Sequence, residues 1–364
     1  IYAGRIDCPR FAWQPADFRD RPRPRRLFGC RAPLPREAPG VVSRRRARTE
    51  AFAMQPAQPI PTLARIALAV DPTPESLSAA RYARTLLRPG MRLRIICAID
   101  NPRLVLPDIP RIDALLTSAR EDLMREAQAI NERIAALFAG SGIEVEQAII
   151  DTSVTGGSVA DALVSDTSAW QADVLVVGAN PHHGLLRLVE GAMSDTLTTR
   201  VRCALLIVPA AYARPSDGGL QRLMFAVDGS EPSLQAVRVG LGFATPTTLL
   251  YAAYVIDRAV RLTDIVPVRA LEDAYRAEGE DALAKIGPLF HATGNPSKRS
   301  VIETRPTSDD VAHALMRDAV HWRAELLVVG THGRRGIAAW LIGSVARRIA
   351  HLAQVPVLLV RGTE

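Results

Sequence analysis

The chain repeats itself, and this internal repeat limits the folds open to it more than any other feature. Residues 65–87 read RIALAVDPTPESLSAARYARTLL, and residues 222–244 read RLMFAVDGSEPSLQAVRVGLGFA. Two further segments match in the same order, DVLVVG with ELLVVG and ALLIV with PVLLV, and each pair is 152 residues apart. Three matched anchors in one order indicate a duplicated domain. We expect domains over 62–212 and 220–364, joined by a short, turn-rich connector.

Each copy alternates short strands with longer helical segments. The strands are rich in Val, Leu and Ile and are apolar at consecutive positions, which is typical of strands covered on both faces. In the second copy we expect strands at 222–227, 249–256, 299–303, 325–329 and 356–360, and helices at 231–244, 267–291, 308–322 and 338–353. The corresponding helices of the first copy are expected at 74–87, 111–139, 157–170 and 186–200. This alternation predicts an α/β chain with a doubly wound, five-stranded parallel sheet in each domain, a Rossmann-like fold.

The positive charge of the chain is concentrated in its first residues. The chain carries a net charge of +7, but the first 53 residues hold 13 arginines and five acidic residues, so the remainder has a charge of −1. The body therefore offers no charge argument for nucleic-acid binding. Residues 1–61 are rich in Arg and Pro and lack apolar periodicity, which predicts a disordered tail. Because Met54 closely precedes the first strand, an over-extended gene start is one interpretation of residues 1–53, and a nucleic-acid-binding arm or targeting peptide is the alternative.

Composition also excludes several classes of protein. No apolar run approaches the ~20 residues that a membrane-spanning helix needs. The four cysteines are scattered, with no Cys-x2-Cys pair, which argues against a disulfide scaffold and a zinc ribbon. The expected location is the cytoplasm.

Glycines and polar residues follow the fourth strand of the second copy. Gly330, Gly333, Gly343 and Ser344 have the spacing Gly-x2-Gly-x9-Gly-Ser, and Asp228 ends the first strand. Glycine amides and a serine hydroxyl can bind phosphate oxygens, whereas a carboxylate can accept a hydrogen bond from a ribose hydroxyl or an adenine amino group. Both groups fall beyond the carboxyl ends of parallel strands, where ligands bind. The residues thus predict a nucleotide site, although the P-loop and Gly-x-Gly-x2-Gly motifs are absent.

With these residues the chain resembles a tandem universal stress protein over residues 62–361. The ATP-binding signature of that family is G-2x-G-9x-G-[S/T], which the second copy matches in full. The resemblance implies that the second domain binds ATP, with Mg²⁺, in a regulatory stress-response protein that is not an enzyme, although some members hydrolyse ATP slowly. It implies no catalytic or metal-ligating residue, and it places Val255 against the adenine. The implied binding residues are Asp228, Val255, Gly330, Thr331, His332, Gly333, Gly343, Ser344 and Val345.

The first copy departs from this signature. Pro181 replaces the second glycine and Ala192 replaces the serine, although Asp71 is kept. Proline has no N–H group and a fixed φ angle, so one amide of the phosphate site is lost. We expect the first domain not to bind ATP and to act as a structural partner of the second.

The sequence is also compatible with two other classes of function. One is an ATP-dependent enzyme of a related α/β class, but the loop DGSEP at 228–232 matches neither an SGGxDS nor an HxGH motif. The other is an interaction module that binds no nucleotide, which the intact signature argues against. Among smaller features, we interpret His182-His183 as loop residues rather than metal ligands, and Asp309-Asp310 as the start of a helix rather than a Mg²⁺ site.

The terminal strands of the two copies predict how the domains meet. Residues 204–208 and 356–360 are short, apolar edge strands, and such edges tend to find a partner. Because a short linker keeps the copies close together, we expect these strands to pair antiparallel within one chain as a pseudo-dimer. A homodimer of whole chains and a protein partner are left open.

Overall fold

The computed structural model describes residues 59–101, 112–179, 192–213, 219–258, 268–305, 309–333 and 342–362. The expected tail over 1–61 therefore lies almost wholly outside the described residues. The elements of the first domain are β1 (Arg65–Val70), α2 (Pro74–Leu86), β2 (Arg92–Ile99), α3 (Ile112–Ala136), β3 (Glu144–Asp151), α4 (Thr152–Thr155), α5 (Val159–Ala169), β4 (Val174–Ala179), α6 (Ala192–Arg200) and β5 (Ala204–Pro209).

The second domain repeats the pattern. Its elements are β6 (Arg222–Ala226), α7 (Glu231–Leu241), β7 (Leu249–Ile256), α8 (Val268–Ala284), α9 (Gly287–Thr293), β8 (Ser297–Glu303), α10 (Val311–Trp322), β9 (Leu326–Gly330), α11 (Ser344–Leu352) and β10 (Val357–Val360).

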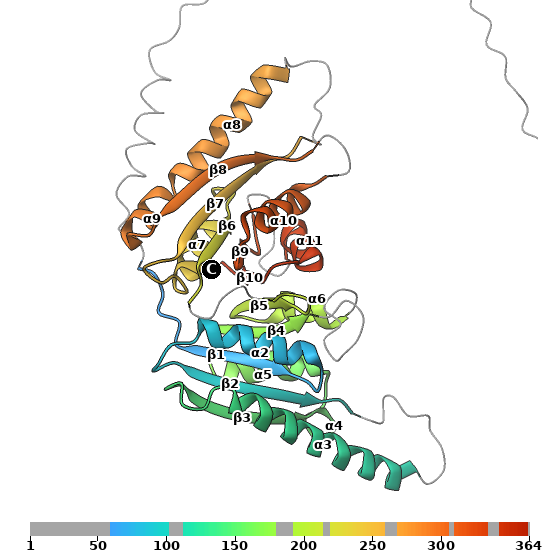
Figure 1. Cartoon of the computed structure of the whole chain (residues 1–364). Helices are drawn as coiled ribbons and strands as arrows, with labels where there is room; N and C mark the ends of the chain where they lie inside the picture. The colour runs from blue at the N-terminus through green and yellow to red at the C-terminus, as the bar shows by residue number, and fades with distance from the viewer. Residues whose placement is uncertain are drawn as a thin grey trace, which may run out of the picture. The chain divides into compact units, whose positions relative to one another are not determined.

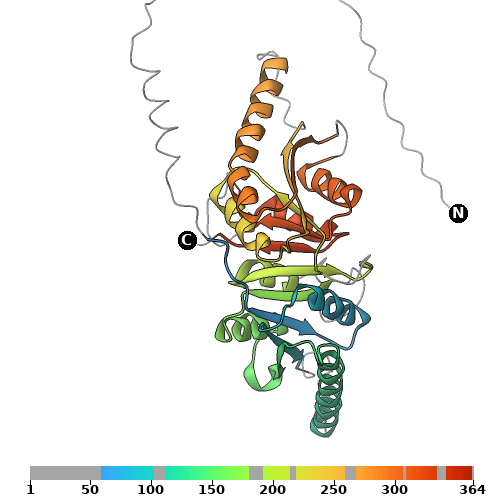
Figure 2. The same ribbon diagram turned by 60° about the vertical axis from the view of Figure 1, so that its left-hand side comes forward.

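The described strands form a single ten-stranded sheet in the order β3-β2-β1-β4-β5-β10-β9-β6-β7-β8. All neighbours within a domain are parallel, so each half is the doubly wound α/β sheet that the sequence predicts. The halves meet at β5 and β10, which pair antiparallel within the chain, as expected from the sequence, and we call this contact the seam (Figures 1 and 2). At the seam Leu206 lies opposite Leu358, and Ile207 lies opposite Val357.

The apolar core runs across the seam on both faces of the sheet. One face packs Ile66 of the first domain into the same cluster as Phe225 and Leu358 of the second. The other face joins Leu205 to Leu359. Because every residue of β4, β5 and β10 is buried, helices cover these strands on both sides. The two domains therefore share their apolar clusters.

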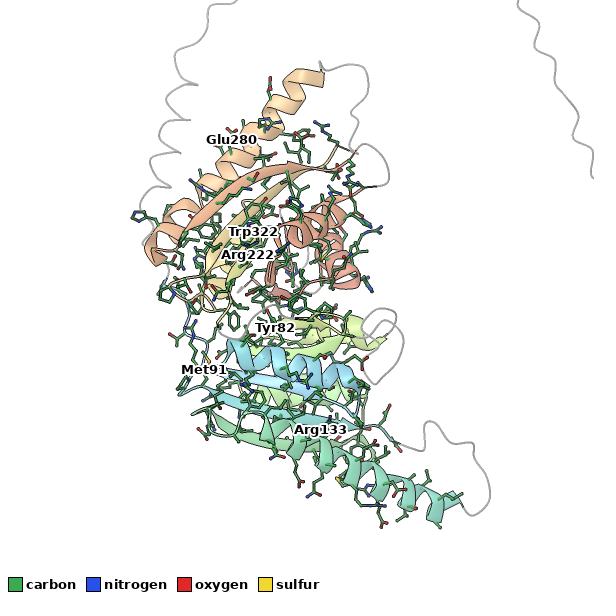
Figure 3. All side chains as sticks on the ribbon, viewed as in Figure 1. Tyr82, Met91, Arg133, Arg222, Glu280 and Trp322 are labelled. Carbon is green, nitrogen blue, oxygen red and sulfur yellow. The ribbon has the colours of Figure 1, made fainter. Side chains whose placement is uncertain are left out.

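Polar groups also cross between the domains. The Tyr82 hydroxyl, labelled in Figure 3, donates to the carbonyl of Glu325 at 2.7 Å. The Arg88 guanidinium donates to the carbonyl of Ala244 at 2.8 Å. Each of these bonds uses a side chain of the first domain and a backbone oxygen of the second.

The observed helices differ from the predicted ones at positions where a capping residue or a proline determines where a helix begins. The single helix expected over 267–291 is divided into α8 and α9, because Pro288 stands in the first turn of a new helix. The helix expected from 338 begins at Ser344, with Gly343 as its N-cap. The short α4 was missed, and Asp151 caps it by accepting from the amide of Ser153. Asp310 caps α10, so the helix-start interpretation of that pair is confirmed.

Candidate functional site

The candidate site lies where β6 and β9 end at the carboxyl edge of the second-domain sheet. The chain leaves β6 toward β7 on one side, and it later returns as β9 on the other side of β6. Because consecutive crossovers depart in opposite directions here, this is the switch point at which open α/β sheets bind ligands. Asp228 follows β6 by two residues, and Gly330 is the last residue of β9.

Asp228 is held in a tight turn at the start of α7. Its Oδ1 atom accepts a hydrogen bond from the Ser230 amide at 3.0 Å and another from the Ser230 hydroxyl at 2.6 Å. Gly229 between them has φ +80°, a left-handed conformation that favours glycine. The Lys285 ammonium group donates to the Gly229 carbonyl at 3.1 Å, which ties this turn to the end of α8.

Gly333 lies directly against the carboxylate of Asp228. A Cβ atom on Gly333 would be only 2.7 Å from Asp228 Oδ2, closer than any ordinary contact. The structure therefore brings together the acidic residue after β6 and the second glycine of the signature, which are 105 positions apart in sequence. Only a residue without a side chain allows this approach.

Gly330 has a structural role that does not depend on a ligand. A Cβ on Gly330 would lie 3.2 Å from the carbonyl oxygen of Pro232, in the first turn of α7. Gly178 occupies the same place in the first domain, where a Cβ would lie 2.9 Å from the carbonyl oxygen of Glu75. Since both copies need this glycine for packing, Gly330 alone does not distinguish a binding domain from a structural one.

The loop after β9 is tied to α11. The amide of Thr331 donates to the Val360 carbonyl at 2.9 Å, and the Thr331 carbonyl accepts from the amide of Gly343 at 2.7 Å. The Gly343 amide is thus engaged by the protein. The first intrahelical bond of α11 runs from Arg347 to Gly343, and no side chain caps this helix. The amides of the first turn, beginning at Ser344, are therefore the ones placed to meet an anion.

His332 and the remaining predicted residues line the same edge. The Thr331 hydroxyl lies 3.0 Å from His332 Nδ1, while His332 Nε2 is buried without a hydrogen-bond partner in the described part of the chain. Ser344 and Val345 are exposed in the first turn of α11. Val255 is half-buried near the end of β7, where it packs against the core. All nine predicted binding residues thus fall in the described part of the chain and at this edge.

An ion pair fixes the orientation of α11 on its neighbour. Arg348 lies 2.6 Å from Asp310, the N-cap of α10. Burial raises the pKa of the Asp310 carboxyl, but hydrogen bonds from His313 and the charge of Arg348 outweigh it and leave that pKa below its ordinary value. Asp310 therefore stays ionised at neutral pH and helps to hold the helix that begins at Ser344.

The matching acidic residue of the first domain has a different environment. Asp71 is 3% exposed, and its Oδ1 atom accepts from the Thr73 amide, the Thr73 hydroxyl and the Ser76 hydroxyl. Asp228, by contrast, is only half-buried. Asp71 therefore stabilises the turn in which it lies. Pro181, His182 and His183 of the first domain lie outside the described residues.

Sequence reasoning missed the roles of Ser230 and Lys285. The spacing Asp-x-Ser before a helix is the available signal for the Ser230 hydrogen bonds, because an Asp side chain often accepts from the backbone two residues on. Nothing local in the sequence points to Lys285, which reaches the turn only through the fold.

Among the residues that the structure describes, no three His, Cys, Asp or Glu side chains gather as a metal site. None of the described helices has the length and apolarity needed to cross a membrane.

Comparison with known proteins gives consistent results. The model of the universal stress protein family matches residues 62–209 and 219–361. A universal stress protein of Mycolicibacterium smegmatis is 27% identical over 301 residues, covering 81% of this chain and 96% of its own. One of Mycobacterium tuberculosis is 28% identical over 194 residues, which is 52% of this chain and 62% of the relative, so the match spans less than two thirds of that protein. The solved universal stress protein of Archaeoglobus fulgidus shares the fold with a TM-score of 0.53 at 13% identity, covering 82% of this chain and 97% of its own.

Proposed function

Because the chain belongs to the universal stress protein family, we propose that it is a regulatory stress-response protein that binds one ATP, in its second domain. The observation that supports this most strongly is the contact between Gly333 and Asp228, since a Cβ on Gly333 would lie 2.7 Å from the carboxylate. In this proposal, the loop that binds the phosphates therefore lies beside the carboxylate that binds the ribose.

Each part of the nucleotide has a matching group in this proposal. The triphosphate is bound by backbone amides near Gly333, by the first turn of α11 and by the Ser344 hydroxyl. The ribose hydroxyls donate to the carboxylate of Asp228. Val255 supplies an apolar contact for the adenine. A Mg²⁺ ion that accompanies the nucleotide would neutralise part of the phosphate charge.

Calorimetric titration of nucleotide-stripped protein tests this assignment. We expect one ATP per chain, and Asp228→Ala should weaken its affinity by about tenfold or more, because a charge-assisted hydrogen bond to the ribose is lost. The matched control is Asp71→Ala in the first domain, which should lower stability but leave ATP affinity unchanged. Two equivalent sites, or no binding by the unmodified protein, would refute the proposal.

We propose binding rather than rapid turnover as the activity, in a cytoplasmic protein. Release of inorganic phosphate, measured with excess ATP and Mg²⁺, checks this directly. Steady turnover at typical enzyme rates, about 1 s⁻¹ or faster, would favour the ATP-dependent enzyme instead.

We also propose that the seam makes the chain a pseudo-dimer, so that the first domain covers an edge that would otherwise need a second chain. Cysteines placed at Ile207 and Val357, opposite each other at the seam, should crosslink within one chain once the native cysteines are replaced. Leu359 lies opposite Leu205 instead, so a pair at 207 and 359 is out of register and serves as the control. Crosslinks only between chains would indicate a homodimer through this strand.

A further inference from the structure

Arg361 links the end of the second domain to a helix of the first. It follows β10, and its guanidinium donates to the Val201 carbonyl at 3.2 Å and also to the Thr199 carbonyl, at the C-terminal end of α6. The last carbonyls of a helix lack intrahelical donors and carry its negative dipole end, so a cation is well suited to this position. Arg361 thus caps a helix that belongs to the other domain.

The residue before Arg361 supports the candidate site. The Val360 carbonyl accepts from the amide of Thr331, and the Thr331 carbonyl accepts from the amide of Gly343. Gly343 is the N-cap of α11, the helix that presents Ser344. Two successive backbone hydrogen bonds therefore connect the strand end anchored by Arg361 to the phosphate end of the site.

Close packing reinforces this connection. Thr331 is 6% exposed and borders a cavity of only about 10 Å³ between the domains. That cavity is lined by residues of both domains: Leu197, Thr198, Val201, Cys203, Leu205, Thr331, Leu359 and Arg361. Most of the side chains that meet here are buried apolar groups from both domains, so this part of the contact is packed like a core.

The residue of the first domain that matches Arg361 cannot make the same contact with the second domain. The position of the first domain that matches Arg361, 152 residues earlier, is Pro209 at the end of β5. Proline has no side-chain donor, so this position does not cap α11 in return. The second domain is therefore the one whose site loop is braced by its neighbour.

We propose that Arg361 is a positioning residue through which the first domain holds the phosphate end of the second-domain site in place. This inference rests on the proposed function. It makes α6 part of the support of the nucleotide site, although the first domain departs from the binding signature.

The test compares Arg361→Ala with Arg88→Ala in the full chain. Both changes remove an arginine that donates to a backbone carbonyl of the other domain, but Arg88 reaches Ala244 and not the site loop. We expect Arg361→Ala to weaken ATP binding by about tenfold, while adenosine, which lacks phosphates, changes by less than about twofold. Arg88→Ala should change neither, and Arg361→Lys should restore part of the ATP affinity because a cation remains at the helix end.

Amide hydrogen exchange gives a readout that needs no ligand. The amides of Thr331 and Gly343 should exchange faster in Arg361→Ala than in Arg88→Ala, because their hydrogen bonds depend on the anchored strand end. Equal losses for ATP and adenosine, or equal effects of both arginine variants, would mean general loosening and would overturn the inference. If the unmodified protein does not bind ATP, the proposed function fails, and the exchange rates alone then decide whether Arg361 braces the loop.

Discussion

Replacing Gly333 by alanine is the sharpest test of how the site is built. Gly333 does not have a positive φ angle, so its backbone can accept alanine without strain. The new Cβ, however, would lie 2.7 Å from Asp228 Oδ2, whereas ordinary contacts begin at 3.4 Å. Either the carboxylate or the loop must therefore move by several tenths of an ångström.

The cost of that movement can be judged from what holds Asp228. Its other oxygen accepts two hydrogen bonds from Ser230, at 3.0 and 2.6 Å, which resist rotation of the carboxylate. Weakening these bonds and displacing the acceptor meant for the ribose should cost about 1–3 kcal/mol of binding free energy, a roughly 5- to 150-fold loss of ATP affinity. Stability should change little, because Gly333 is exposed.

A double-mutant cycle measured by calorimetry separates this mechanism from a general disturbance of the loop. Gly333→Ala, Asp228→Ala and the double variant are each titrated with ATP. If alanine at 333 acts through the carboxylate, it should have almost no further effect once Asp228 is gone. The reasoning is refuted if the two losses simply add, or if Gly333→Ala binds ATP as well as the unmodified chain.

Three further predictions concern the rest of the chain. Deleting residues 1–53 should leave the melting temperature and ATP affinity unchanged, because that segment lacks apolar periodicity; a large fall in either would contradict this. In the shortened chain the buried Cys97 thiol should react with a thiol reagent only after unfolding, because burial raises its pKa to about 12. Burial raises the pKa of the Asp309 carboxyl, but hydrogen bonds from the Arg305 amide and Arg317 outweigh the effect of burial. The pKa of Asp309 is therefore lowered. Ionised Asp309 should therefore contribute fully to the free energy of unfolding above about pH 4, and this contribution should be lost as the pH falls further. Chemical denaturation should detect the loss in the native chain and not in Asp309→Asn.

The fold was predictable because its signals are local and repeated. Buried parallel strands are apolar at consecutive positions, and three matched anchors specify the same alternation twice. The errors occur where one residue decides a boundary. Pro288 starts α9 and divides one expected helix into two, and Gly343 caps α11 and delays its start. The ends of these helices depend on backbone geometry, about which the apolar periodicity of the sequence gives no information.

Sequence reasoning could place the candidate residues at one edge of the sheet, but it could not give the contacts that each of them makes. Spacing alone groups Gly330 with Gly333, yet the structure separates them. Gly330 is required by packing against α7, as Gly178 is in the other copy, whereas Gly333 faces Asp228. Contacts between segments that are far apart in sequence arise only in the fold. A sequence motif therefore cannot show which glycine packs against a backbone and which packs against a carboxylate.

The two copies place their matching acidic residues in different environments. In the first, Asp71 is buried and its Oδ1 atom accepts three hydrogen bonds from its own turn, so that carboxylate is not presented to a ribose. In the second, Ser230 bonds one oxygen of Asp228, and the other oxygen lies against Gly333. A carboxylate enclosed by its own turn stabilises a fold, whereas a half-exposed one beside a glycine loop can be reached from the solvent. The contacts that the first domain makes with the second include a paired strand at the seam and a helix end that Arg361 caps.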